Sequence, residues 1–92
     1  MFAWLNKQGV QCDRGFAVQF TGRFSAEYRE GINMITLDIE SGMSEGKPCI
    51  ILDANAFSRW DNGNAIPQER SKKILDNFRQ AMEFQGLSLV VE

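Results

Sequence analysis

Carboxylates are the only side chains in this sequence that could carry acid-base chemistry. The chain contains no histidine, and its single tyrosine, Tyr28, lies in a strand-like pattern beside charged neighbours. Asp38 and Glu40 are two residues apart, so on a strand they would share one face with their Cβ atoms about 7 Å apart. Paired carboxylates can separate their pKa values and act as acid and base. The alternative, which we favour, is a solvated outer face of a sheet.

No motif for a nucleophile, a metal or a phosphate accompanies these carboxylates. The serines and cysteines have no histidine as a base, no serine lies in a Gly-x-Ser-x-Gly elbow, and the glycines lack a phosphate-binding spacing. Residues 61–64 resemble the start of a calcium loop, but Lys72 occupies the position of the bidentate glutamate. A turn accounts better for this segment. We therefore predict a protein that is not an enzyme and holds no metal or cofactor.

Length and composition predict a single α+β domain over residues 1–92, large enough for one core. The net charge of -2 is spread over interspersed acidic and basic residues, which gives no footprint for a nucleic-acid backbone. No apolar run approaches the roughly 18 residues of a membrane span, and the N-terminus lacks the basic region of a signal peptide. These features argue against nucleic-acid and membrane partners and favour the cytoplasm.

The two cysteines, Cys12 and Cys49, lie far apart in apolar, strand-like runs. Two cysteines without histidine cannot form a structural zinc site. We expect buried free thiols, because unpaired cysteine is among the most often buried residue types. A disulfide between two strands is the alternative.

The first half of the chain is predicted to be β-rich. Three segments alternate apolar and other residues with the period of a strand: residues 16–20, 24–28 and 35–39. Residues 49–52 are apolar on both faces, which is typical of a central strand. Residues 41–46 contain two glycines and two serines and are expected to form a loop. Residues 1–8 are either a loosely held arm or an edge strand.

A helix is predicted from Pro67 to about Gln85. Pro67 suits the first helical position, and Gly86 suits the stop after the last turn. Alternating apolar residues after Gly86 indicate a final strand. We therefore expect a mainly antiparallel sheet of about five to six strands packed against one long C-terminal helix and followed by a final strand. The apolar stripe of the helix consists of Ile74, Leu75, Phe78, Ala81 and Met82.

The junction from Ser58 to Arg70 passes from strand to helix through a polar turn. Trp60 is either an interface anchor beside Arg59 or the side chain that closes one end of the core beneath the helix. Asp61 would then cap the turn or pair with Arg70, which would fix the angle between strand and helix. The predicted structural residues of this junction are Trp60, Asp61, Pro67, Glu69 and Arg70.

The same junction resembles the immunity protein 74-like family of bacterial polymorphic-toxin systems. In that family a Trp-Asp pair follows a strand, a proline-containing turn comes next, and a Glu-Arg pair opens the helix. Trp60, Asp61, Glu69 and Arg70 occupy the corresponding places, and the similarity covers about the last two-thirds of the chain. The family often has prolines directly after Trp-Asp, where this chain has Asn62-Gly63, so the turn differs.

The resemblance implies a cytoplasmic, non-enzymatic protein that binds a cognate toxin domain tightly and blocks it. An acidic face would steer association with a basic nuclease. We predict contact residues on the outer sheet face and its rim: Asp38, Glu40, Asp53, Arg59 and Trp60. Two alternatives remain open. One is a structural or adaptor domain that acts as a homodimer, through an edge strand, or as a subunit of a larger complex. The other is an enzyme that uses Asp38, Glu40 or Asp53 in a pocket.

Overall fold

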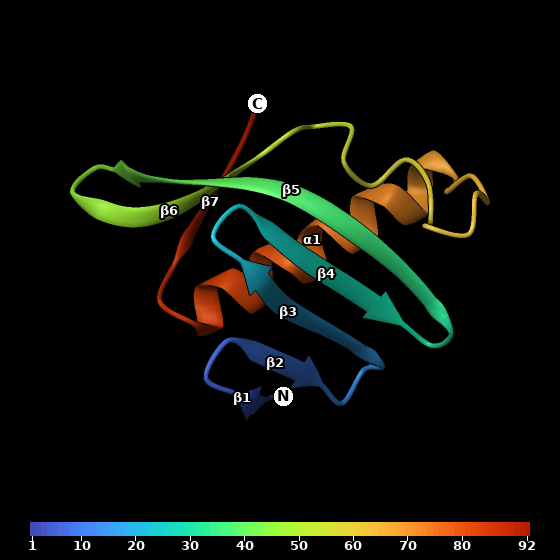
Figure 1. Cartoon of the computed structure of the whole chain (residues 1–92), viewed down its shortest axis with the longest axis horizontal. Coiled ribbons are helices and arrows are strands. Elements are labelled where there is room, and N and C mark those ends of the chain that lie inside the picture. Colours follow the sequence, from blue (N-terminus) through green and yellow to red (C-terminus); the bar gives the residue numbers. More distant parts are fainter.

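The computed structural model describes residues 1–92 as a seven-stranded sheet with one helix, and it confirms the predicted α+β fold (Figure 1). The helix α1 lies against one face of the sheet, behind β3 and β4 in the view of Figure 1. The elements in chain order are β1 (Phe2–Asn6), β2 (Gly9–Cys12), β3 (Phe16–Gly22), β4 (Ser25–Glu30), β5 (Asn33–Ser44), β6 (Lys47–Leu52), α1 (Gln68–Phe84) and β7 (Ser88–Val91).

The spatial order of the strands follows the order of the chain from β1 to β7. Neighbouring strands are antiparallel except for β6 and β7, which are parallel. A parallel pair needs a crossover, and residues 53–67 together with α1 provide it. The predicted final strand therefore returns to the sheet beside β6.

Strand β5 joins two parts of the sheet. Its first half, Asn33–Asp38, pairs with β4, and its second half, Ile39–Ser44, pairs with β6. In Figure 1 the hairpin of β5 and β6 extends away from the strands that cover the helix. The outward-facing residues near Asp38 and Glu40 therefore lie where the sheet passes from one part to the other.

The core forms between α1 and the inner face of the sheet. The predicted apolar stripe is confirmed for Ile74, Phe78, Ala81 and Met82, which are buried, whereas Leu75 is only partly buried. Burying a large apolar side chain of this kind contributes about 1.5–3 kcal/mol. Alternate residues of the strands pack against the stripe: Val10, Cys12, Phe16, Val18, Ala26, Tyr28, Ile35, Leu37 and Ile39.

The helix ends agree closely with the prediction. Pro67 is the N-cap residue, with φ -56° and ψ 147°, so it lies just before the helix and not at its first position. At the other end Gly86 has a φ of 79°, a conformation that suits glycine, and its N–H donates to the carbonyl of Glu83. The Leu87 N–H donates to the carbonyl of Met82, which completes the helix stop.

The predicted loop over residues 41–46 was wrong for most of its length. Residues 41–44 belong to β5, and only Glu45 and Gly46 form the turn, with positive φ at both. This turn is typical of a two-residue hairpin. Gly42 lies opposite Cys49, and a Cβ there would come within 3.2 Å of the Ile51 Cδ1 atom. Strand pairing and packing therefore override the low strand propensity of the glycine.

Residues 2–6 form the edge strand β1, one of the two alternatives for residues 1–8. Aromatic contacts attach it to the helix end: the rings of Phe2 and Phe84 are 5.4 Å apart, and those of Trp4 and Phe84 are 5.7 Å apart. Cys12 and Cys49 are both buried and carry free thiols, so no disulfide joins the strands.

Candidate functional site

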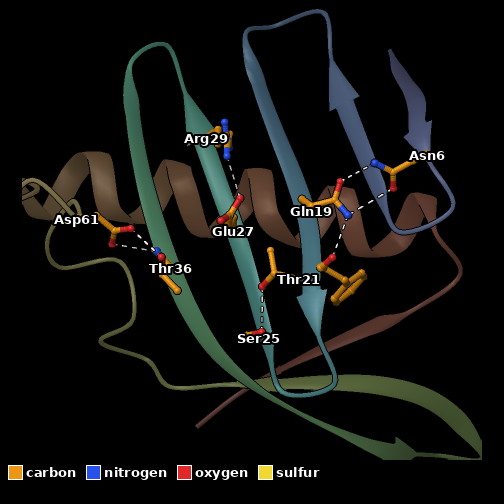
Figure 2. Close-up of polar contacts among 9 residues, drawn as sticks. Asn6, Gln19, Thr21, Ser25, Glu27, Arg29, Thr36 and Asp61 are labelled. Carbon is orange, nitrogen blue, oxygen red and sulfur yellow. Dashed lines mark hydrogen bonds and ion pairs between the residues drawn. The ribbon is translucent and has the colours of Figure 1, made fainter.

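Asp61 closes one edge of β5. The first half of β5 pairs with β4 on one side only, and the segment between β6 and α1 covers the other side. The Asp61 N–H donates to the Met34 carbonyl at 2.8 Å. Its two carboxylate oxygens accept from the N–H and the hydroxyl of Thr36, at 3.0 and 2.7 Å (Figure 2). One aspartate thus satisfies main-chain groups that a further strand would otherwise pair.

The turn after Asp61 is held by its own side chains. The Asn62 side-chain oxygen accepts from the Asn64 N–H at 3.0 Å. Gly63 has a φ of 94°, which suits glycine. The Arg59 guanidinium donates to the Gly63 carbonyl, so this predicted contact residue is engaged within the turn.

Trp60 and Arg70 belong to a polar and aromatic network at the end of β4. The half-buried Trp60 ring stacks on Tyr28 with the ring centres 6.4 Å apart. The Tyr28 hydroxyl donates to Glu30 at 2.8 Å and accepts from Asn77 of α1 at 3.1 Å. Arg70 forms an ion pair with Glu30, so of the two alternatives for Asp61, capping the turn or pairing with Arg70, the pairing was wrong.

We call this network the junction cluster: Tyr28, Glu30, Thr36, Trp60, Asp61, Arg70 and Asn77. Tyr28 is fully buried. Burial raises its pKa above the ordinary value of 10.0, because the charged phenolate is poorly solvated there. All polar members of the cluster have hydrogen-bond partners, which is the pattern of a structural network.

Polar side chains on the outer face of β1, β3 and β4 also pair with one another. Figure 2 shows Asn6 with Gln19, Thr21 with Ser25, and Glu27 with Arg29. Their closest polar atoms are 2.8, 2.9 and 3.1 Å apart. These six side chains are thus occupied by neighbours on the same face.

A groove with a different character lies where β5 passes from β4 to β6. Its volume is about 660 Å³. Asp38 and Glu40 come from β5, Asp53 follows β6 and Glu92 follows β7. Phe24, from the turn between β3 and β4, is 62% exposed. We call this groove the acidic groove. Its lining residues are Phe24, Asp38, Ile39, Glu40, Ser41, Ile51, Leu52, Asp53 and Glu92.

The carboxylates of the acidic groove lack cationic partners. None of the four takes part in an ion pair, and no lysine or arginine lines the groove. Only Asp53 accepts a hydrogen bond, from the Asn55 N–H at 2.7 Å. No group of three or more histidine, cysteine, aspartate or glutamate side chains is arranged to hold a metal ion. The groove therefore offers negative charge beside an exposed aromatic ring, and the Arg23 guanidinium lies over that ring with its carbon 5.8 Å from the ring centre.

Three of the five predicted contact residues come together in this groove: Asp38, Glu40 and Asp53. Arg59 and Trp60 do not line it, because they belong to the segment that crosses the first half of β5. Sequence reasoning missed Phe24 and Glu92. The pairing of Ile39 N–H with the Phe24 carbonyl and of Glu92 N–H with the Leu52 carbonyl brings them to the groove.

Cys12 is a second titratable group with a perturbed environment. Burial raises the pKa of its thiol, but hydrogen bonds from Arg14 outweigh that effect, so the pKa is lowered overall. The Arg14 Nε atom lies 3.4 Å from the sulfur, and Arg14 also donates to Gln80 of α1. Cys12 is 6% exposed and does not line the acidic groove.

Comparison of the chain with protein-family models, with curated proteins and with solved structures finds no match. The single helix falls short of the length and apolar character that crossing a membrane requires.

Proposed function

We propose that this chain is a non-enzymatic immunity-type protein that neutralises a cognate toxin domain by tight association, in the cytoplasm of a bacterium. The toxin would dock on the acidic groove. The observation that carries this proposal is a concave surface with four carboxylates and no lining cation, beside the exposed Phe24. The resemblance of the junction to immunity proteins supports the same class.

Charge gives the groove a preference for a basic partner. Carboxylates without internal partners keep their field available to solvent, which steers a cationic surface toward the groove and raises the association rate. Lysine or arginine side chains of a nuclease domain would supply the missing counter-charges. Association should therefore weaken as salt increases.

The apolar part of the groove would mainly slow the dissociation of the bound toxin domain. Phe24 is exposed in a turn, and Ile51 lies on the same wall as Glu40, its partner across the β5–β6 ladder. Aromatic side chains at the centre of an interface often carry a large share of the binding free energy. We expect Phe24 to govern mainly the dissociation rate, and the carboxylates mainly the association rate.

The test begins with capture of the tagged protein from its native cells and identification of any stoichiometric partner by mass spectrometry. The partner domain is then expressed alone and together with this chain. Relief of growth inhibition on co-expression is the expected result. A partner with no toxicity, or a toxicity that this chain does not relieve, would contradict the proposal.

The groove assignment is tested on the purified pair. D38N with E40Q should weaken binding by at least about tenfold and reduce its salt dependence. E27Q is the matched control, because Glu27 lies on the outer face, pairs with Arg29 and does not line the groove. Equal affinity of the groove variant and wild type would remove the groove from the interface.

A second candidate function is a structural or adaptor domain that works as a homodimer or within a larger complex. The open edge of β7, the last strand of the sheet, favours this alternative. Strand β7 itself contributes no lining residue to the groove, although Glu92, directly after β7, lines it.

A further inference from the structure

Strand β7 has one unpaired edge. It is the last strand of the sheet and its only neighbour is β6. The Glu92 N–H donates to Leu52, and the Glu92 carbonyl accepts from Ala54. Alternate residues of a parallel strand point their main-chain groups to the same side, so Val90 and Ser88 also face β6. The N–H and C=O groups of Leu89 and Val91 therefore point to the open side.

Strand β7 is short, with four residues, but it lacks the other usual protections of an edge strand. The four residues of β7 contain no charge and no proline, and their register with β6 is continuous from Ser88 to Val91. At the other edge of the sheet, β1 is irregular between Trp4 and Asn6. A regular, uncharged edge is a template for another strand.

We propose that the occupant of this edge is β7 of a second copy, in antiparallel pairing about a twofold axis at Val90. In this register Leu89 lies opposite Val91 of the second copy and exchanges two hydrogen bonds with it. The symmetric pair exchanges two more. All four outward groups of each chain are then satisfied by the same strand of the other, as an isologous interface requires.

The side chains fit the same register. Val90 lies opposite Val90 of the second copy, and Leu89 lies opposite Val91, so all central cross-strand pairs are aliphatic. Glu92 lies opposite Ser88, so no two like charges face each other. This self-complementarity favours a second copy over a strand of unrelated sequence.

A cysteine at the axis tests the register directly. Val90 and its symmetric counterpart form a non-hydrogen-bonded pair, with Cα atoms about 4.5 Å apart, within the range of a disulfide. V90C should therefore cross-link to itself under mild oxidation. V91C is the matched control, because its counterpart lies diagonally, beyond about 7 Å. Wild type is the blank, since Cys12 and Cys49 are buried. Equal cross-linking of the two variants would overturn the register.

Introducing a charge at Val90 tests the strand pairing without oxidation. Sedimentation equilibrium between about 1 µM and 1 mM should show a reversible wild-type dimer. V90K and V90E should each dimerise at least tenfold more weakly, because like charges would face each other at the axis. Their equimolar mixture should recover dimerisation. A wild-type chain that stays monomeric at the highest concentration would overturn the proposal. So would an equimolar mixture of V90K and V90E that dimerises no more strongly than either variant alone.

The proposed dimer interface and the groove share Glu92, but the carboxylates of β5 lie outside the dimer interface and Val90 lies outside the groove. D38N with E40Q should leave the dimer unchanged, and V90K should leave the groove residues in place. A failure of dimerisation is thus distinguishable from a failure of toxin binding.

Discussion

The junction cluster and the acidic groove lie along the same strand and use the same kinds of residue in opposite ways. In the junction cluster Asp61 accepts two hydrogen bonds from Thr36, and Glu30 is shared by Tyr28 and Arg70. In the groove Asp38, Glu40 and Glu92 have no side-chain partner within the chain. The difference separates carboxylates that hold the fold from carboxylates that remain available for binding.

The largest effect should come from Trp60. W60A removes a half-buried ring that stacks on Tyr28, and we expect a loss of about 2–3 kcal/mol in the free energy of unfolding. Denaturant unfolding measures it. W4A is the matched control and should cost about 1 kcal/mol or less, because Trp4 is 53% exposed on an edge strand. Equal losses would show that Trp60 is not part of the core.

Asp61 should have the next largest effect. D61A removes both acceptors of Thr36 and leaves the Thr36 main-chain N–H without a partner in the chain. The free energy of unfolding should fall by about 2 kcal/mol. D38A is the control. Asp38 lies on β5, as Thr36 does, but its side chain makes no such hydrogen bonds, so D38A should change the free energy of unfolding by less than about 0.5 kcal/mol. A double-mutant cycle with T36V isolates the side-chain bond. No coupling in that cycle would contradict the assigned contact.

Y28F tests the buried end of the junction cluster. Loss of the hydroxyl removes bonds to Glu30 and Asn77 and should cost about 1 kcal/mol at neutral pH. Because the folded-state pKa of Tyr28 is raised, its contribution is fully present below the unfolded pKa near 10 and is lost as the pH rises through the folded value. The stability difference between wild type and Y28F should therefore fall above about pH 10. A difference that grows with pH would reverse the assigned direction of the shift.

The smallest effect on stability should come from the groove. D38N with E40Q removes two negative charges that have no cationic partner, so we expect a change within about 0.5 kcal/mol, toward greater stability at low salt. Unfolding at low and high salt measures it. A loss above about 1 kcal/mol in the free energy of unfolding would mean that these carboxylates stabilise the fold. The groove would then not differ from the junction cluster in this respect.

Local patterns predicted most of the fold. The alternation of Ile35, Leu37 and Ile39 predicted the buried face of β5, and the same alternation placed Asp38 and Glu40 on the outer face. The stripe of α1 and its stop at Gly86 followed from helical spacing and turn chemistry. These features depend on residues close together in the sequence, which is why the sequence reveals them.

The parts that escaped prediction depend on distant pairing. Residues 41–44 became a strand because β6 pairs with them, although their glycine and serines favour a loop. Phe24 and Glu92 reached the acidic groove through backbone bonds to Ile39 and Leu52, which no local pattern encodes. The partner of Asp61 was misjudged for the same reason, since Thr36 lies on a strand 25 residues earlier.

The position of α1 after six of the seven strands sets the order in which the protein is completed during synthesis. Strands β1 to β6 pair with their neighbours in sequence and can assemble as they emerge from the ribosome. Their inner face, including Val18 and Leu37, remains without its cover until α1 follows. At about 5–20 residues per second, the 32 residues from the end of β6 to the end of α1 take about 2–6 s to synthesise. During that interval the nascent sheet presents an apolar surface that a chaperone can occupy.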